Sequence, residues 1–334
     1  MGISRLLIRN IIETDFGGII NKFKISKRRD VLFFEEILAK YIKKCELAGY
    51  KKEMMDAARE WGFLYVKNFM PKIMENAPKN ILFNRFLKRV WIELGLLEEF
   101  RAEINGNEIT FITYDEAITR HTGENEFCKG LWEGVLSGIY RCKAETIYAE
   151  QSPVKSVYNF RLTHLPFSVK SKSKTLYLRL NTFRGKGELK KYIKAHVLVL
   201  KGNRMTFRGK SVVIGENTLF HIFGTKKILI NIVSEISSCF LDEIIEKDSS
   251  FESKINLLKN ILQVFGWGKV KIVYSRERID IEIQNPPYGI QSNDDNWIFL
   301  SHFILGYLLL TDRRCRLSEI NQLGKSIRIS YKTG

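Results

Sequence analysis

The C-terminal part of the chain, from residue 255 onward, contains the pattern that most constrains the fold. It opens with an amphipathic run over 255–265 that ends at Gly266, as expected for a helix C-cap. Runs that alternate apolar and polar residues follow at 269–274 and 279–283 and predict a hairpin. An apolar helix at 299–310 and two further alternating runs complete the unit. The predicted order is therefore helix, hairpin, helix, hairpin.

The same unit is predicted earlier in the chain. A helical run at 81–95, two alternating runs and a helix at 130–138 occur in the same order. Short details recur as well, since Arg-Cys stands at 141–142 and again at 314–315. Matched positions lie about 170 residues apart throughout, which a single chance motif would not produce. Two unrelated helices of similar composition are the alternative explanation.

The repeat predicts an α+β fold with antiparallel sheets packed on long helices. We expect two tandem domains, 1–165 and 166–334, and the second includes a basic strand segment at 166–210. Two copies are too few for a solenoid, because stacked repeats need several units to bury a continuous core. The two domains are therefore expected to pack together as an intramolecular pseudo-dimer.

Segments that precede each repeat are also predictable. A first hairpin is expected around 15–18, where glycine supplies the turn, and helices are expected at about 32–48 and 51–76. In the second half, helical runs are expected at 217–223 and 226–246. Asp-Ser-Ser at 248–250 is expected to cap the helix that opens the second repeat.

Composition favours a folded protein that does not cross a membrane. The 334 residues are 45% hydrophobic and 12% aromatic, which is enough for two domains with real cores. The longest apolar run, 303–310, has about eight residues, well short of the roughly 18 to 20 that span a bilayer. The N-terminus carries Arg5 and Arg9 within its apolar part and is a poor signal peptide. We expect a cytoplasmic protein.

Cysteine usage argues against a metal centre and against a disulfide framework. The five cysteines are scattered and lack CxxC spacing: Cys45, Cys128, Cys142, Cys239 and Cys315. We therefore predict no metal and no cofactor.

No catalytic constellation is visible. The histidines are dispersed and form no known motif: His121, His164, His196, His221 and His302. Gly-Lys-Ser at 209–211 lacks the upstream glycine of a P-loop. The carboxylate pairs at 98–99, 115–116 and 294–295 are expected in loops or at helix ends, as solvated pairs. The sequence predicts a protein that is not an enzyme, with no catalytic residue.

The formal charge of +17 is unevenly distributed. The first half carries about +4 and the second about +13, and about thirteen Lys and Arg between 166 and 210 face one acid, Glu188. Basic strands with interleaved aromatics suit a nucleic-acid backbone or an anionic surface, whereas lysines on a strand edge also simply prevent aggregation. The candidate contact residues for a nucleic acid or an anionic surface are Arg184, Lys186, Lys190, Lys191, Lys194, Arg204, Arg208 and Lys210.

Both halves resemble a known family, the 4-vinyl reductase domain, whose superfamily includes TRAPP trafficking subunits and heme-nitric-oxide-binding domains. The resemblance is carried by glycines near the long helices and by apolar patterns, namely Gly49, Gly62, Gly224, 130–138, 160–162, 265–272 and 281–287. It covers most of both halves, and it implies the same fold for each. It does not account for the basic excess at 166–210.

The resemblance also raises the question whether this chain has the zinc ligands of such domains. Many such domains hold zinc with a cysteine ahead of the second helix and with two cysteines and a glutamate in the last hairpin. Cys128 lies near the first position, but the closing hairpins at 145–160 and 318–329 contain no cysteine. Zinc normally needs four ligands, so Cys128 is expected to be a buried apolar residue.

The resemblance further implies an apolar cavity for aromatic effectors, acyl chains or other small hydrophobic molecules. The aromatics that could line it are Trp61, Phe63, Trp91, Trp132, Phe223, Trp267, Phe303 and Tyr307. The alternative is that these rings are ordinary core residues. Gly134 and Gly306 are expected to allow close approach of another helix, a ligand or a dimer partner.

Two functional hypotheses follow. The first is a non-enzymatic ligand-binding or scaffold protein, effector-sensing or assembly-forming, whose partner is a small hydrophobic molecule, a protein or a second copy of the chain. The alternative is a nucleic-acid-associated regulator that binds a phosphate backbone through 170–210. Ionic strength separates them, because phosphate contacts weaken steeply with salt and an apolar pocket does not.

Overall fold

The fold is α+β, as the sequence predicts. The computed structural model describes residues 12–15, 18–21, 29–69, 76–169, 192–193, 195–201, 204–246, 248–287, 295–311, 314–324 and 326–334. The elements of the first half are, in order, β1 (Ile12–Asp15), β2 (Gly18–Asn21), β3 (Arg29–Phe34), α2 (Glu35–Leu47), α3 (Lys51–Phe69), α5 (Lys79–Ile81), the π-helical segment η1 (Leu82–Leu87), α6 (Lys88–Glu93), β4 (Glu99–Asn105), β5 (Glu108–Tyr114), α7 (Thr119–Thr122), α8 (Glu126–Tyr140), β6 (Cys142–Gln151) and β7 (Lys155–Pro166).

The second half has its strands and long helices in the same order. Its elements are β8 (Leu198–Lys201), β9 (Arg204–Phe207), β10 (Lys210–Glu216), α10 (Thr218–Lys226), α11 (Ile232–Leu241), α12 (Phe251–Val264), β11 (Lys269–Tyr274), β12 (Arg278–Gln284), α13 (Asp295–Leu308), β13 (Arg316–Leu323) and β14 (Ser326–Lys332). The predicted order helix, hairpin, helix, hairpin is thus present twice.

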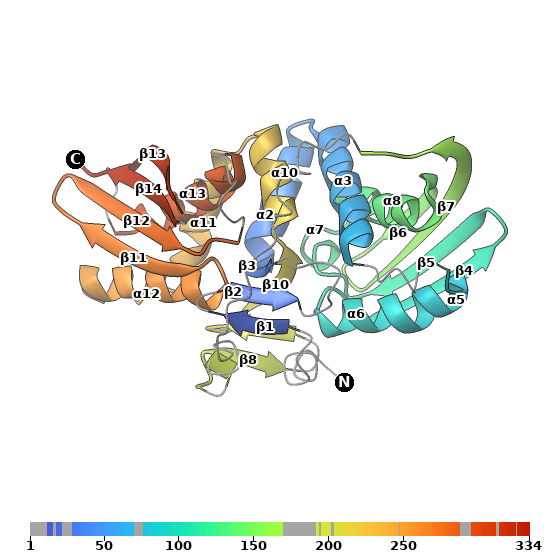
Figure 1. The fold of residues 1–334 in the computed structure, drawn as a ribbon, viewed down its shortest axis with the longest axis horizontal. Coiled ribbons are helices and arrows are strands. Elements are labelled where there is room, and N and C mark those ends of the chain that lie inside the picture. Colours follow the sequence, from blue (N-terminus) through green and yellow to red (C-terminus); the bar gives the residue numbers. More distant parts are fainter. Residues whose placement is uncertain are drawn as a thin grey trace.

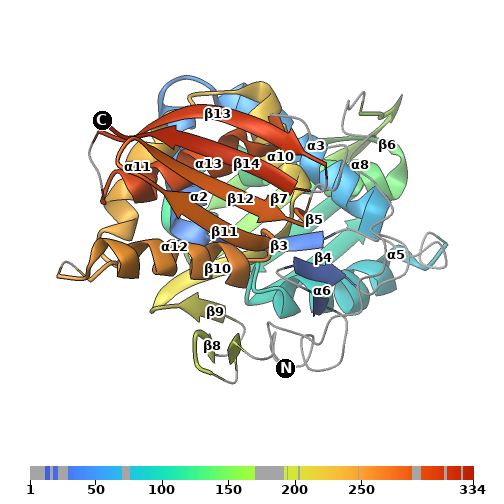
Figure 2. The same ribbon diagram turned by 60° about the vertical axis from the view of Figure 1, so that its left-hand side comes forward.

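The strands form three antiparallel sheets. Each half has a four-stranded sheet, of order β4-β5-β7-β6 in the first and β11-β12-β14-β13 in the second. A six-stranded sheet of order β1-β2-β3-β10-β9-β8 contains strands of both halves. The four-stranded sheets lie at opposite ends of the molecule, with the long helices between them (Figure 1). Figure 2 shows the second of these sheets in front of α11 and α13.

The six-stranded sheet joins the two halves at its centre. β3 pairs antiparallel with β10, with Phe33 opposite Val213 and Val31 opposite Gly215. Beyond the end of β2, the backbone N–H of Leu32 donates to the carbonyl of Phe265 at 2.8 Å. The halves therefore share backbone hydrogen bonds as well as side-chain packing.

One element differs in type from the sequence prediction. Residues 32–34 were expected to open a helix, but they belong to strand β3, and the helix begins at Glu35. Leu32 is 0% and Phe33 1% exposed, although they point to opposite faces of the sheet. An apolar run that is buried on both faces has no period, so it cannot be distinguished from a buried helix by pattern.

A second difference is the length of the helix expected at 226–246. The chain leaves the helical conformation after α10, where Lys227 has φ 52° and Leu229 has φ 42°, and α11 covers only Ile232–Leu241. Ile228 and Ile230 are buried in this irregular segment. Burial of these two side chains stabilises the irregular backbone between α10 and α11. The spacing of the apolar residues does not predict this break in the helix.

Several local predictions are confirmed. Asp15 pairs with Gly18 in the first hairpin. Ser250 accepts a hydrogen bond from the N–H of Ser253 at 3.2 Å and caps α12. Gly266 follows the end of that helix with φ 82°, a left-handed conformation that glycine adopts without strain.

Helix α8 lies very close to α3. A Cβ added at Gly134 would be 2.1 Å from the carbonyl oxygen of Arg59, and one at Gly62 would be 2.3 Å from that of Leu131. In the second half, a Cβ at Gly306 of α13 would be 2.3 Å from the carbonyl oxygen of Ser234 in α11. Gly134 and Gly306 were expected to allow close approach of another helix, a ligand or a dimer partner. The structure shows another helix at both positions.

None of the helices in the described part of the chain combines the length and the apolarity that crossing a bilayer requires.

Gly134→Ala should destabilise the protein by more than about 3 kcal/mol, because the added methyl group meets rigid backbone rather than a movable side chain. Urea denaturation would measure the loss. Gly215→Ala is the matched control, because no atom lies within 4 Å of its added Cβ, and its stability should stay within about 0.5 kcal/mol of wild type. Equal stability of the two variants would contradict the close contact of α3 and α8.

Candidate functional site

A cavity of about 70 Å³ lies where the helices of the first half meet β3 and β10. α3 contributes Trp61 to its wall, α6 contributes Trp91, and α8 contributes Trp132. Trp91 and Trp132 are in edge-to-face contact, with ring centroids 4.8 Å apart. Helix packing in the first half thus supplies a rigid aromatic wall.

The opposite wall comes from the central sheet and α10. Val31 and Phe33 of β3 lie on the same face as their partners Gly215 and Val213 of β10, because alternate residues of a strand share a face. Phe220 of α10 also lines the cavity. No atom lies within 4 Å of a Cβ added at Gly215. The side-chain position of Gly215 is therefore open space on the cavity face.

One buried carboxyl group stands at the edge of this apolar space. Glu116 is 6% exposed and accepts hydrogen bonds from Trp132 Nε1 at 2.7 Å, Tyr158 OH at 2.7 Å and Thr119 Oγ1 at 2.5 Å. Burial raises the pKa of Glu116 above its ordinary 4.5, and the three donors oppose that rise. Burial also raises the pKa of Tyr158. The carboxyl group thus orients the indole of Trp132 in the wall.

The first turn of α8 is fixed by side chains from two other segments. Asn125 caps the helix by accepting from the N–H of Cys128 at 2.7 Å. Glu46 of α2 accepts from the N–H groups of Glu126 at 2.8 Å and Phe127 at 3.1 Å. A carboxylate at a helix N-terminus satisfies backbone donors that have no partner inside the helix. These contacts hold Phe127 and Cys128 in the cavity wall.

Cys128 is 1% exposed, and burial raises the pKa of its thiol well above the ordinary value. Thr119 Oγ1, whose proton is donated to Glu116, lies 3.4 Å from the sulfur of Cys128. Within the described ranges no group of three or more His, Cys, Asp and Glu side chains could hold a metal ion. The surroundings of Cys128 therefore do not fit the zinc site that the family resemblance implies.

Trp61 carries a polar atom without a partner. Its side chain is 8% exposed and lines the cavity, and its Nε1–H makes no hydrogen bond to the described residues. The adjacent Gly62 packs against the backbone of Leu131, which fixes α3 against α8 at this point. Trp61 thus holds a buried donor at a defined place.

The structure places the predicted pocket aromatics in three groups. Trp61, Trp91 and Trp132 line the cavity. Phe63 lies in a separate surface pocket, in edge contact with Phe167 at 5.2 Å. The remaining rings are buried in the core of the second half: Phe223, Trp267, Phe303 and Tyr307.

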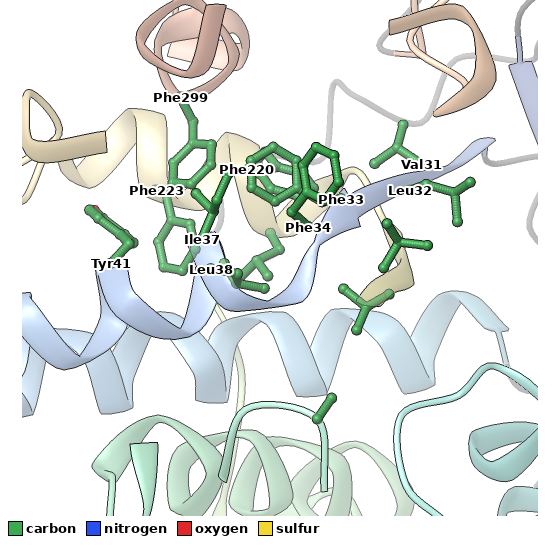
Figure 3. Close-up of a cluster of buried hydrophobic side chains, with 14 of the residues drawn as sticks. Val31, Leu32, Phe33, Phe34, Ile37, Leu38, Tyr41, Phe220, Phe223 and Phe299 are labelled. Atoms are coloured by element: carbon green, nitrogen blue, oxygen red, sulfur yellow. The ribbon is translucent and has the colours of Figure 1, made fainter. Parts of the chain in front are cut away.

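Aromatic rings fill the space between β3, α10 and α13. The ring centroid of Phe33 is 5.0 Å from that of Phe220, 5.4 Å from that of Phe299 and 5.2 Å from that of Phe303. Figure 3 shows Phe33 beside Phe220, and Phe299 beside Phe223. Phe33 thus contributes to the cavity wall and to this cluster.

The candidate basic surface is described only in part. Arg184, Lys186, Lys190, Lys191 and Lys194 lie outside the described residues. The other three are ion-paired with acids of this chain: Arg204 with Asp115, Arg208 with Glu246 at 3.7 Å, and Lys210 with Glu243. These three charges are thus partly neutralised within the protein.

The expectation that Asp115 and Glu116 form a solvated pair is wrong. Glu116 is buried under the aromatic wall, and Asp115 bonds to Arg120 and Arg204. Sequence analysis also missed Gly215. The only local signal for Glu116 was the apolar pair 117–118 that follows it, and nothing in the sequence shows that Gly215 faces a cavity.

No family model, no curated protein and no solved structure matches this chain.

Glu116→Gln should remove a pH dependence of stability. Because burial raises the folded-state pKa of Glu116, its stabilising contribution is present below about pH 4.5 and is lost as pH rises through the folded pKa. Wild type should therefore lose more stability between pH 5 and pH 8 than the variant, as measured by urea denaturation. Glu252→Gln, at an exposed position, is the control and should keep the wild-type slope. Identical slopes for wild type and Glu116→Gln would contradict the raised pKa.

Proposed function

We propose that this chain is a non-enzymatic binding protein for a small hydrophobic molecule, built from two tandem domains of the 4-vinyl-reductase type that form an intramolecular pseudo-dimer. The observation that supports this most is the apolar cavity with three tryptophans and one oriented carboxyl group in its wall. An apolar pocket with a few placed polar groups is the usual form of a small-molecule site. The twofold order of elements and the shared central sheet support the pseudo-dimer.

The cavity size limits the ligand. An apolar cavity of about 150 Å³ admits benzene, so the 70 Å³ here accepts a smaller group without movement. A ligand with a benzene ring requires the side chains of the wall to move apart. The ligand is therefore a small apolar molecule or the end of a longer chain.

The two domains have different roles in this proposal. The first supplies the aromatic wall, and the second closes the cavity with Val213, Gly215 and Phe220. Beside the cavity, Phe33 of the first domain packs against Phe220 and Phe299 of the second domain. A ligand in contact with both domains would strengthen their association, which suits an effector-sensing protein or an assembly scaffold.

The nucleic-acid alternative gains no support from the described residues. Arg204, Arg208 and Lys210 are paired with carboxylates, which compete with phosphate for the same donors. The apolar cavity is therefore the preferred basis for function.

Native mass spectrometry of the purified protein, followed by mass analysis of an organic extract, tests the proposal. A bound small apolar molecule is expected, with a yield that does not depend on salt. Protein without such a molecule, and without a thermal shift in a screen of small apolar compounds, would refute it. Nucleic acid that is removed by high salt would favour the alternative function.

Gly215→Val should abolish binding and stabilise the empty protein. The added side chain occupies the cavity, and at about 24 cal/mol per Å³, filling 70 Å³ contributes at most about 1.7 kcal/mol. Thermal denaturation with and without ligand measures both effects. Ser211→Val lies on the same strand outside the cavity and controls for strand propensity. Retained ligand binding in Gly215→Val would place the site elsewhere.

A further inference from the structure

The polar atoms of the cavity wall are unequally satisfied. Trp132 donates its indole N–H to Glu116, whose carboxyl oxygens also accept from Tyr158 and Thr119. Trp61 lines the same cavity, and its indole N–H is buried without a partner among the described residues. The indole N–H of Trp132 is thus used within the protein, whereas that of Trp61 has no partner among the described residues.

We propose that the indole N–H of Trp61 binds the ligand, which is therefore a neutral, apolar molecule with one hydrogen-bond acceptor, such as a ketone, an ether or an ester. This inference rests on the proposed function. A buried donor without a partner destabilises the empty protein, and a ligand acceptor would remove that penalty. Ligands without an acceptor leave the penalty in place.

The surroundings of Trp61 argue against two other partners. A buried water typically needs two to four polar contacts, whereas the wall near Trp61 is formed largely by apolar side chains such as Phe127 and Leu131. The ring of Phe127 has its centroid 6.2 Å from that of Trp61. An anionic ligand would be desolvated in the same apolar wall, close to the carboxyl group of Glu116. A neutral ligand with one acceptor needs only one polar contact, and it brings no charge into the apolar wall.

Local structure holds the donor in position. Gly62 lets the backbone of α3 contact that of α8 next to Trp61, where an added Cβ would be 2.3 Å from the carbonyl oxygen of Leu131. The indole is also in tilted contact with Phe127. Trp61 stands on α3, which packs closely against α8. Its N–H is therefore preorganised, and little entropy is lost when a ligand binds.

Acetone and isobutene form a matched ligand pair, alike in size and shape, different in one acceptor and smaller than a benzene ring. We expect the ketone to bind wild type about tenfold more tightly, the effect of one net hydrogen bond. In ¹⁵N-labelled protein, the five tryptophans give separate indole N–H signals. The Trp61 signal should shift downfield with the ketone and not with the hydrocarbon.

Trp132 is the internal control, because its N–H already donates to Glu116 at 2.7 Å and should not acquire a new bond. Trp61→Phe keeps an aromatic ring without the donor. This variant should bind the ketone and the hydrocarbon with about equal affinity. The wild-type titration does not depend on whether this variant folds.

Three results would overturn the inference. Equal affinity for both compounds, with no specific shift of Trp61, would show binding without the donor, and the proposed function would survive. Binding of neither compound would overturn the inference and count against the proposed function as well. A ketone that binds Gly215→Val as tightly as wild type would place the contact outside this cavity.

Discussion

The antiparallel pairing of β3 with β10 is the interaction on which the cavity depends. It sets Val31 opposite Gly215 and Phe33 opposite Val213, so that residues distant in sequence form one wall. A shift of the register by one residue would turn these side chains to the other face of the sheet. The hydrogen bond from Leu32 to Phe265 extends the contact of β3 with the second half. Neither half could form this cavity alone.

Tight packing and open space lie next to each other on one face of the central sheet. Around Phe33, Phe220 and Phe299, ring centroids lie 5.0 to 5.4 Å apart, as in an ordinary aromatic core. On the same face of the sheet, Gly215 leaves space that a larger residue could fill without contact. Interiors are normally close-packed, and empty volume lowers stability. Space that a single side chain could fill is therefore consistent with the ligand proposed above.

Much of the fold could be predicted from the sequence, because its elements are periodic. The hairpin at 269–283 and the helix that ends before Gly266 have clear alternation and end signals. β3 could not be predicted, since Leu32 and Phe33 are buried on opposite faces and leave no period. Sequence patterns report which residues are apolar within an element, but not which element covers them.

The candidate site was less predictable for the same reason. Trp61, Trp91 and Trp132 were recognised as aromatics on helices, but so were Phe223 and Trp267, which the structure places in a core. The distinction depends on packing between halves, which leaves no local signal. Glu116 could not be recognised either, because its burial depends on donors as distant as Tyr158.

The loop that carries Glu116 also joins the halves through charge. Asp115, with φ 52°, is ion-paired with Arg204 of β9, and Arg120 donates to its backbone carbonyl at 2.8 Å. Arg120 also pairs with the buried Glu35 at 3.1 Å. The side chain of Arg204 is 48% exposed and that of Arg120 is 9% exposed, so salt screens the Asp115–Arg204 pair more than the Arg120–Glu35 pair. Because the next residue, Glu116, stands in the cavity wall, any ligand that displaces this wall must also strain the ion pair between the halves.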